Sequence, residues 1–377
     1  MSINSTLKKE GIKVISELGT LEINKIASNI SEKICSAFPE HSINQSELFI
    51  SIARLNMYIA EMPASDLAVA KYFYKNNSIY FSKDMDLTNL NTLALHECIH
   101  FIQEIKNKRG KLLRLGLYDL ENKNTTGMAI NEAAVQLMAS IATSSPIDTV
   151  KYYNMELSTE SPLFYPIQTA LVKQMIYFTG SYPLFHSTLY SNDIFKNTFI
   201  EKSSAKAYSD IIYNLDLLVD YEEQLNNVSY KLSISSDESS LSQVKKMNNQ
   251  ILALKNIILQ KTIETQNIII NSCFNSEFDS IRTSEDIKTF QLKLYNFKNL
   301  LINSENYNFF NDFYCEMMNK LDEKRENIKK YGILTNFSTQ TSLSIIEEET
   351  YGFKFFKKLF EKIKLLFEEK IREKNLD

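Results

Sequence analysis

The sequence predicts an α+β protein that is predominantly helical, with a small antiparallel sheet beside the helix that carries the candidate site and a helical C-terminal region. Two observations predict this class. The 377 residues include only 8 Gly and 6 Pro, with 44% hydrophobic and 23% charged residues, which is typical of an ordered, helix-rich chain. Apolar residues recur at helical spacing through most of the chain, whereas runs of strand type lie before residue 83.

Charge and cysteine usage narrow the class of protein. The net charge is −4, and the first 340 residues contain no basic patch with interleaved aromatic residues, so we expect no nucleic-acid partner. The four cysteines are far apart and form no C-x-x-C pair, which argues against a disulfide framework and for a reducing compartment. Neither a signal peptide nor a membrane span is visible, so we expect a cytoplasmic protein, with export by a non-classical route left open. Frequent Asn, Ile and Lys are typical of an AT-rich bacterial genome.

The first 82 residues predict packing helices followed by strands. Ile23, Ile26, Ile30 and Ile34 lie near helical spacing, and Pro39 ends that segment. The stretch ELFISIARLNMYIAEMP is expected to pass from a helix into a short strand before Pro63. In AVAKYFYKNNSIYFS, two short runs flank Asn76 and Asn77, which tolerate the positive φ of a tight loop, so we expect an antiparallel hairpin.

A helix is predicted next, and it contains the motif His-Glu-x-x-His. Asp86 or Thr88 would cap its start, and Gly110 would end it after about five turns. His96 and His100 are four residues apart, so on a helix they lie on one face and can share an ion. Glu97 points about 100° away around the axis and falls beside that ion, within reach of a bound water.

Two histidines do not complete a catalytic zinc site, which usually has three protein ligands. The metzincin continuation is absent, because Gln103 and Lys106 stand where its Gly and third His would be. Downstream, TTGMAINEAAVQLMAS predicts a second helix, capped by Thr125 or Thr126, with an Asn131-Glu132 pair 32 residues after His100.

The two motifs together resemble the gluzincin group of zinc metallopeptidases, over about residues 65–140. The resemblance implies that His96, His100 and Glu132 are zinc ligands and that Glu97 is the catalytic base. Thermolysin-like members carry an Asp four residues after the ligand Glu, where this chain has Gln136; a Gln there could still hydrogen-bond a ligand histidine. The group also presents an edge strand to peptide substrates, and SIYFS (Ser78 to Ser82) is placed for that role or is simply a core strand.

A developing oxyanion needs a donor besides the metal, and two candidates follow the metal motifs. They are Tyr165 and His186, although a residue of this kind is more often a packing residue with a satisfied polar group. Glu104, four residues after His100, could hold that ligand or could lie on a solvated helix face. Cys98 lies two residues from each histidine, which turns it away from the metal and into the core.

Beyond the motifs the chain is expected to be helical. PIQTALVKQMIYFTG begins with a Pro suited to a first turn and ends at Gly180. The polar stretch Ser233 to Ser240 separates two long segments that would form a helical hairpin. From Phe353 onward, eight Lys or Arg stand against five Asp or Glu on an amphipathic helix, which would contact a membrane surface or partner, or pack on the protein itself.

These expectations combine into one organisation of the chain. Residues 1–220 would form a gluzincin-like metallopeptidase domain, residues 221–340 a helical hairpin or bundle, and residues 341–377 an amphipathic basic C-terminal helix. The predicted activity is hydrolysis of peptide bonds in a peptide or protein substrate, with Zn²⁺ as cofactor. The alternative is a helical interaction or membrane-associated protein that retains a structural or inactive zinc site.

Overall fold

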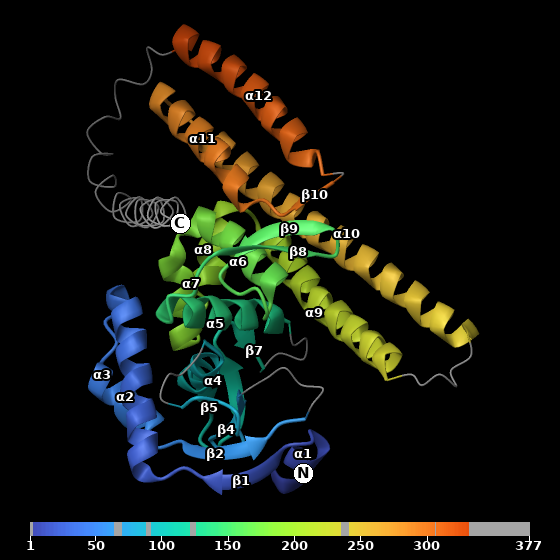
Figure 1. Ribbon diagram of the computed structural model, residues 1–377. Coiled ribbons are helices and arrows are strands. Elements are labelled where there is room, and N and C mark those ends of the chain that lie inside the picture. Colours follow the sequence, from blue (N-terminus) through green and yellow to red (C-terminus); the bar gives the residue numbers. More distant parts are fainter. Residues whose placement is uncertain are drawn as a thin grey trace, which may run out of the picture. The chain divides into compact units, whose positions relative to one another are not determined.

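A computed structural model describes residues 3–63, 70–87, 92–120, 126–234, 241–305 and 307–331 (Figure 1). The described chain is mostly helical, with small mixed and antiparallel sheets in the N-terminal half and long helices in the C-terminal half, which confirms the predicted fold class. It divides into two compact units. Of the described residues, the first unit holds those up to Phe278 together with Leu294–Phe310, and the second holds Asp279–Lys293 and residues 311–331.

The N-terminal sheet has four strands in the order β1-β2-β4-β3. Its bounds are β1 (Lys13–Glu17), β2 (Asn56–Glu61), β3 (Ala70–Phe73) and β4 (Ser78–Ser82). The predicted hairpin is confirmed, because β3 and β4 pair antiparallel and Asn77 in their loop has a φ of 49°. The sheet is mixed, since β2 and β4 are parallel. Strand β1, whose five residues are all exposed, was not predicted.

The predicted edge role of Ser78–Ser82 is wrong. Strand β4 lies between β2 and β3 in the sheet and most of it is buried, so its backbone groups pair on both sides. The edge strand on that side is β3, which packs against the motif helix α4 (Thr92–Ile102). The alternative that SIYFS is a core strand therefore holds.

Helix α4 is shorter than predicted. It ends at Ile102, and the chain then forms an antiparallel hairpin of β5 (Glu104–Lys106) and β6 (Leu112–Leu115). The side chain of Asn107 accepts hydrogen bonds from the backbone N–H groups of Arg109 and Lys111, and Gly110 adopts a φ of 76°. The Gly and the basic residues that suggested a helix end thus form a hairpin loop. Thr88, one of the predicted caps, lies outside the described residues.

Helix α5 (Met128–Ala142) packs along α4 and carries the Asn-Glu pair. Its start is not capped by Thr126, because the cap residue is Gly127, with a φ of 99° and no side chain. Instead, Asp216 on α9 (Ala205–Ser233) accepts hydrogen bonds from the N–H groups of Gly127 at 2.7 Å and Ala129 at 2.8 Å. A carboxylate from a distant helix therefore satisfies the first turn of α5.

Further helices surround this pair in the first unit. Ile26, Ile30 and Ile34 bury one face of α2, and Gly180 ends α6 as predicted. The remaining elements are α1 (Ile3–Lys9), α2 (Thr20–Ala37), η1 (Pro39–His41), α3 (Gln45–Ile52), β7 (Tyr118–Asp119), β8 (Asp148–Tyr152), β9 (Met155–Thr159), α6 (Pro166–Thr179), α7 (Ser181–Tyr190), α8 (Ile194–Lys202), η2 (Phe297–Leu300) and β10 (Asn303–Ser304). Strands β5-β6-β7 and β10-β9-β8 form two small antiparallel sheets.

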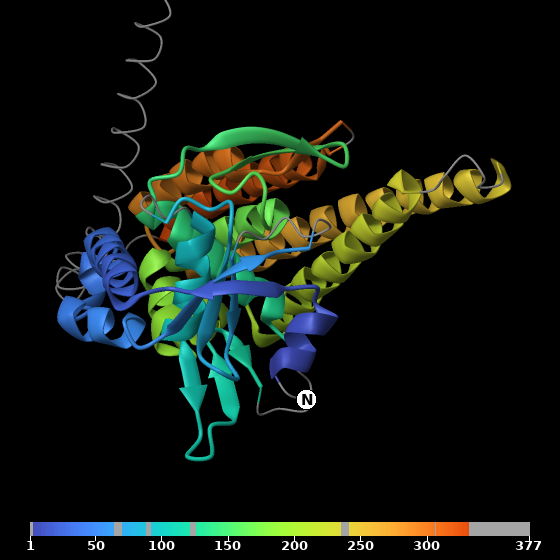
Figure 2. The same ribbon diagram turned by 60° about the horizontal axis from the view of Figure 1, so that its bottom comes forward.

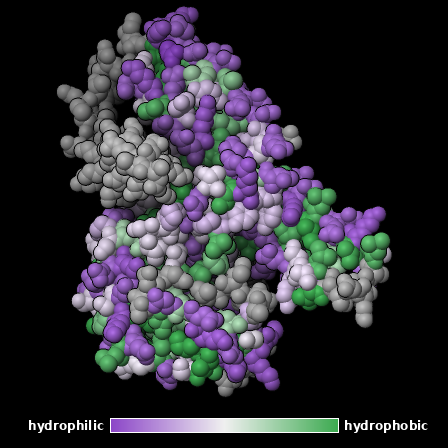
Figure 3. All heavy atoms as spheres, viewed as in Figure 1, coloured by the Kyte–Doolittle hydropathy of each residue, from purple (hydrophilic) through white to green (hydrophobic). Residues whose placement is uncertain are grey.

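Helices α9 and α10 (Leu241–Ser280) run side by side in both ribbon views (Figures 1 and 2). The predicted stripe on α10 is only partly covered: Ile258 is buried, whereas Val244 and Leu254 are half-buried. Toward the joined ends Leu241 is 85% exposed, and Figure 3 shows hydrophobic and hydrophilic residues side by side there.

The second unit contains α11 (Ser284–Asn296), up to Lys293, and α12 (Phe309–Tyr331), from Asn311. Ile287, Phe313 and Leu321 are buried, and Arg325 donates from Nη2 to Oε1 of Gln291 at 3.3 Å.

The predicted amphipathic helix after residue 340 lies outside the described residues. The predicted domain boundary at residue 220 falls within α9 and stays a prediction. Among the described helices, none is both long enough and apolar enough to cross a bilayer.

Candidate metal centre

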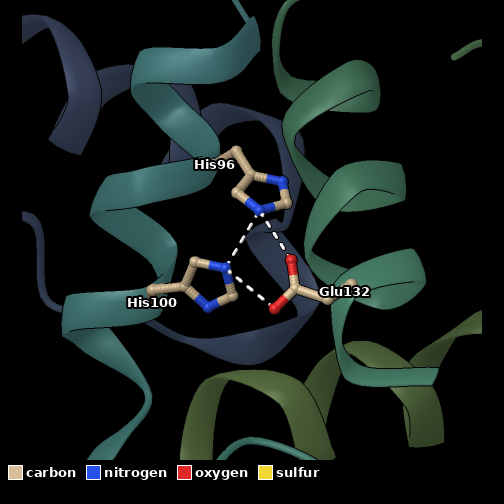
Figure 4. Close-up of side chains that lie close together, drawn as sticks. All are labelled: His96, His100 and Glu132. Atoms are coloured by element: carbon tan, nitrogen blue, oxygen red, sulfur yellow. Dashed lines mark hydrogen bonds and ion pairs between the residues drawn. The ribbon is translucent and has the colours of Figure 1, made fainter. Parts of the chain in front are cut away.

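Helices α4 and α5 bring two histidines and a glutamate to one point (Figure 4). His96 and His100 project from consecutive turns of α4, and Glu132 projects from α5 toward both rings. Nε2 of His96 lies 2.9 Å from Nε2 of His100 and 3.1 Å from a carboxylate oxygen of Glu132. The other oxygen of Glu132 lies 3.4 Å from Nε2 of His100. One ligand atom from each residue falls within 4.8 Å of the others, so this group could hold a metal ion.

The charges of the three residues reinforce one another. Burial opposes ionisation of Glu132, but the two imidazoles outweigh it and hold the pKa of Glu132 well below its usual range. Burial likewise opposes charge on His100, but the carboxylates of Glu132 and Glu97 raise the pKa of His100 to about 9. The two carboxylates therefore give the group a negative electrostatic potential, which attracts a cation, either a proton or a metal ion.

The donor set suits a divalent transition metal. Imidazole nitrogens and a carboxylate oxygen are ligands of zinc and of its neighbours in the first transition row. The two imidazole nitrogens and the carboxylate oxygen converge in a buried site, with His96 5% and His100 8% exposed, so a shared proton or a metal ion among them offsets the cost of burying them. The residues thus fit a metal, and the distances alone do not identify it.

A second layer of side chains surrounds the rings. Nδ1 of His96 lies 2.9 Å from Oε1 of Gln136, which confirms that Gln136 can hydrogen-bond this candidate ligand. Nδ1 of His100 lies 2.8 Å from Oε1 of Gln103. Glu104 is not the partner of His100, because its carboxylate bonds the Tyr72 hydroxyl at 2.9 Å and the Lys106 ammonium. In both histidines, therefore, Nδ1 faces an amide oxygen and Nε2 faces the point where a metal ion would bind.

Glu97 lies beside the metal group and is held by the edge strand. The backbone N–H of Tyr72 on β3 donates to Oε2 of Glu97 at 2.7 Å. Burial raises the pKa of Glu97, while the two histidines and this N–H lower it, and the net direction is upward. A carboxylate with a raised pKa accepts a proton more readily than an ordinary glutamate. One of its oxygens is bonded to β3, which orients the other.

Tyr165, one of the two proposed oxyanion donors, does lie at the site. Its ring stacks on that of His96, with the planes 10° from parallel, and its hydroxyl is close enough to Glu132 to be affected by the charge of that carboxylate. Burial, and then the charges of Glu132 and Glu97, raise the pKa of Tyr165 above its usual value, so its hydroxyl stays protonated. The residue precedes α6 and has a φ of 51°, a left-handed conformation that is uncommon for an aromatic residue.

His186, the other proposed donor, lies in a separate aromatic cluster. Its ring stacks with those of His41 at 5.8 Å and Tyr182 at 5.2 Å, and it contacts Tyr190. None of these three residues contacts the metal group in the described part of the chain. His186 is on the opposite side of α7 from Thr188, whose carbonyl faces Gln103. The structure therefore does not bring His186 together with His96, His100 and Glu132.

Sequence reasoning missed Gln103 and the backbone of Tyr72. The sequence drew notice to Gln103 only because it stands where the metzincin motif has Gly. Its position three residues after His100 is the feature that could have identified it as a partner of that histidine. The role of the Tyr72 N–H has no side-chain signal, since any residue would supply it. Cys98 is fully buried, as predicted.

Comparison with protein-family models, with curated protein sequences and with solved structures found no match. A groove of about 830 Å³ lies between α9 and α10, and its lining includes none of the residues of the metal group. The case for function therefore rests on the geometry of the residues around His96, His100 and Glu132.

Proposed function

We propose that the protein is a zinc-dependent metallopeptidase of gluzincin type. The observation that carries the proposal is the convergence of His96, His100 and Glu132, with the carboxylate of Glu97 beside them on the helix that carries the two histidines. His96, His100 and Glu132 would hold the ion. When bound, zinc would supply Lewis-acid polarisation of the scissile carbonyl and lower the pKa of a water molecule.

Glu97 is the general base of this proposal. It takes a proton from the attacking water and then delivers it to the leaving amine nitrogen, so the carboxylate is unchanged after one turnover. The raised pKa of Glu97 favours proton acceptance, and the hydrogen bond from the Tyr72 N–H keeps the carboxylate from rotating away. Proton transfer of this kind contributes about 10²- to 10⁴-fold to a rate.

Tyr165 supplies the oxyanion donor. Its hydroxyl is protonated and lies at the metal group, where a neutral donor can stabilise negative charge that develops on the carbonyl oxygen. His186 takes no part in this mechanism. An extended substrate would lie along β3, which is the edge strand beside α4, and would pair with outer backbone groups other than the Tyr72 N–H, which is bonded to Glu97.

A second candidate is a metal site that serves structure alone in a helical interaction protein. The buried hydrogen-bond network around the two histidines favours a rigid site, and a structural metal site would also be rigid. The two candidates differ in whether the metal keeps a position open to water. Glu97 and Tyr165 support the enzyme, because a purely structural site has no use for a base and a donor at its mouth.

The test uses the purified full-length protein. Metal analysis should find one zinc per chain, and digestion of a peptide library should reveal cleavage that a chelator abolishes. Glu97→Gln should bind zinc in the same ratio and lose hydrolysis, whereas His96→Ala should lose both. Zinc that remains stoichiometric, with no cleavage of any peptide by the wild type, would favour the structural site.

A further inference from the structure

The side chain of Gln103 is buried beside the candidate metal centre and is held there by several hydrogen bonds. Gln103 directly follows α4 and is 1% exposed, and its backbone N–H still donates to the carbonyl of Ile99, which keeps it in helical register with His100. Its amide makes contacts with His100, Asn131 and Thr188, which come from three different helices.

The orientation of this amide follows from backbone groups. The carbonyl of Thr188 can only accept, so the Gln103 atom 3.2 Å from it must be the donor Nε2. The N–H of Leu117 can only donate, so the Asn131 atom 3.1 Å from it must be Oδ1. The two amides then pair twice, Nε2 of Gln103 with Oδ1 of Asn131 and Nδ2 of Asn131 with Oε1 of Gln103, both at 3.1 Å.

This orientation sets which nitrogen of His100 carries a proton. Oε1 of Gln103 is an acceptor, and it lies 2.8 Å from Nδ1 of His100, so Nδ1 must be the N–H. The lone pair of the neutral ring is then on Nε2, the atom that faces His96 and Glu132. A fixed N–H on one side of a histidine is the usual way in which a protein orients a metal ligand.

The surroundings of the pair leave little room for another arrangement. Gly116 has a φ of 56°, and a Cβ there would lie 2.2 Å from both Asn131 Oδ1 and Gln103 Nε2. The hydroxyl of Ser191 donates to the carbonyl of Gln103 and accepts from the N–H of Gly116 at 2.7 Å. Glycine at position 116 therefore allows the loop to close over the paired amides.

We propose that Gln103 is a positioning residue that locks His100 in the tautomer with Nε2 free for a metal ion. This inference rests on the proposed function, since it assumes that the group binds a metal. Gln is the residue that the site requires: a carboxylate could accept the His100 proton but could not donate to Thr188 or Asn131. His96 is held less firmly, because within the described residues Gln136 has one further hydrogen bond, from its Nε2 to the Ser140 hydroxyl at 3.5 Å.

The test measures zinc affinity of the full-length protein by competition with a chromophoric chelator. Gln103→Met removes the acceptor and should weaken zinc binding by about 10- to 100-fold. Gln103→Glu restores the acceptor and should recover most of that affinity, although its unpaired partners lower the melting temperature of the metal-free protein. Gln174→Met, which deletes a buried amide bonded to Gln266 at 2.7 Å, should lower stability and leave affinity unchanged.

Three outcomes separate the inference from the proposed function. If the wild type binds no zinc, both fail. If the wild type binds zinc and Gln103→Met binds it equally well, or if affinity follows melting temperature across all three variants, the positioning role is wrong. Should Gln103→Met fail to fold, the nitrogen chemical shifts of the zinc-loaded wild type decide: coordination of His100 through Nε2 with a protonated Nδ1 supports the inference, and coordination through Nδ1 overturns it.

Discussion

The rings of Tyr165 and His96 are stacked, with centroids 6.4 Å apart and planes 10° from parallel. This contact places a phenol hydroxyl at the metal group while the ring itself covers one side of a candidate ligand. The two functions of the side chain can therefore be separated by removing the hydroxyl alone.

Tyr165→Phe should keep the stack and the metal and lose a donor to the oxyanion. We expect kcat to fall by about 10²- to 10³-fold, with zinc content and KM close to those of the wild type. Steady-state kinetics with a cleaved peptide measures both constants. Tyr190→Phe is the control, because its hydroxyl bonds the carbonyl of His41 away from the metal group. Equal rates for Tyr165→Phe and the wild type would remove Tyr165 from the mechanism.

Asp216→Ala should destabilise the fold through the first turn of α5. The carboxylate bonds two backbone N–H groups of that turn, and its loss leaves them without an acceptor, at a cost of about 1 to 3 kcal/mol in the free energy of unfolding. Urea denaturation of the metal-free protein measures this change. Asp220→Ala, an exposed position on the same helix, should change the free energy of unfolding by no more than about 0.5 kcal/mol.

His41 should make the protein less stable in mild acid. Burial, and then the charge of His186, lower the pKa of His41 from 6.5 to about 4. The unfolded chain therefore binds the proton more tightly than the folded chain, and stability is lost as pH falls from about 6.5 toward 4. The loss by pH 5 should be on the order of 2 kcal/mol.

His41→Phe tests this prediction, since Phe can retain the stack with Tyr182, in which the rings are 4.7 Å apart, and does not titrate. Denaturation at pH 7.5 and at pH 5 should show a smaller difference for the variant than for the wild type. An identical difference in both proteins would assign the acid sensitivity to other groups.

Glu222 should have the opposite dependence on pH. Burial raises its pKa to about 7, although Nε2 of Gln168 donates to it at 2.6 Å and opposes that shift. The folded chain binds the proton more tightly than the unfolded chain, so stability is lost as pH rises from about 4.5 to 7. Glu222→Gln should therefore melt at a higher temperature than the wild type at pH 8, and the gain should disappear near pH 4.5. The exposed neighbour provides the control variant Glu223→Gln, for which no gain is expected.

The sequence predicted correctly those features that depend on the spacing of nearby residues or on the backbone preference of one residue. The separation of His96 and His100 by four residues needs only a helix, and the Asn-Glu pair needs only a second helix beside it. The sequence also predicted the hairpin through Asn77 and the end of α6 at Gly180, since both depend on backbone preferences of single residues.

It failed where a contact distant in sequence decides the local structure. The first turn of α5 is satisfied by Asp216, 89 residues from Gly127, so the nearby threonines were misleading. The end of α4 at Ile102 has a similar origin, because the carbonyl of Gln103 bonds the distant Ser191 hydroxyl. The order of strands, which makes β3 and not β4 the edge, depends on a parallel pairing that no pattern within SIYFS reports.

The four histidines of the chain all lie in the described residues, and they form two pairs. One pair converges on a carboxylate, and the other is packed among tyrosines, with three ring nitrogens lacking any hydrogen-bond partner in the described residues. Histidine signals in a magnetic resonance spectrum will therefore fall into two families with different neighbours. Addition of a metal ion should perturb the signals of His96 and His100 and leave those of His41 and His186 in place, so the imidazole resonances would distinguish ligand binding from a change in the aromatic cluster.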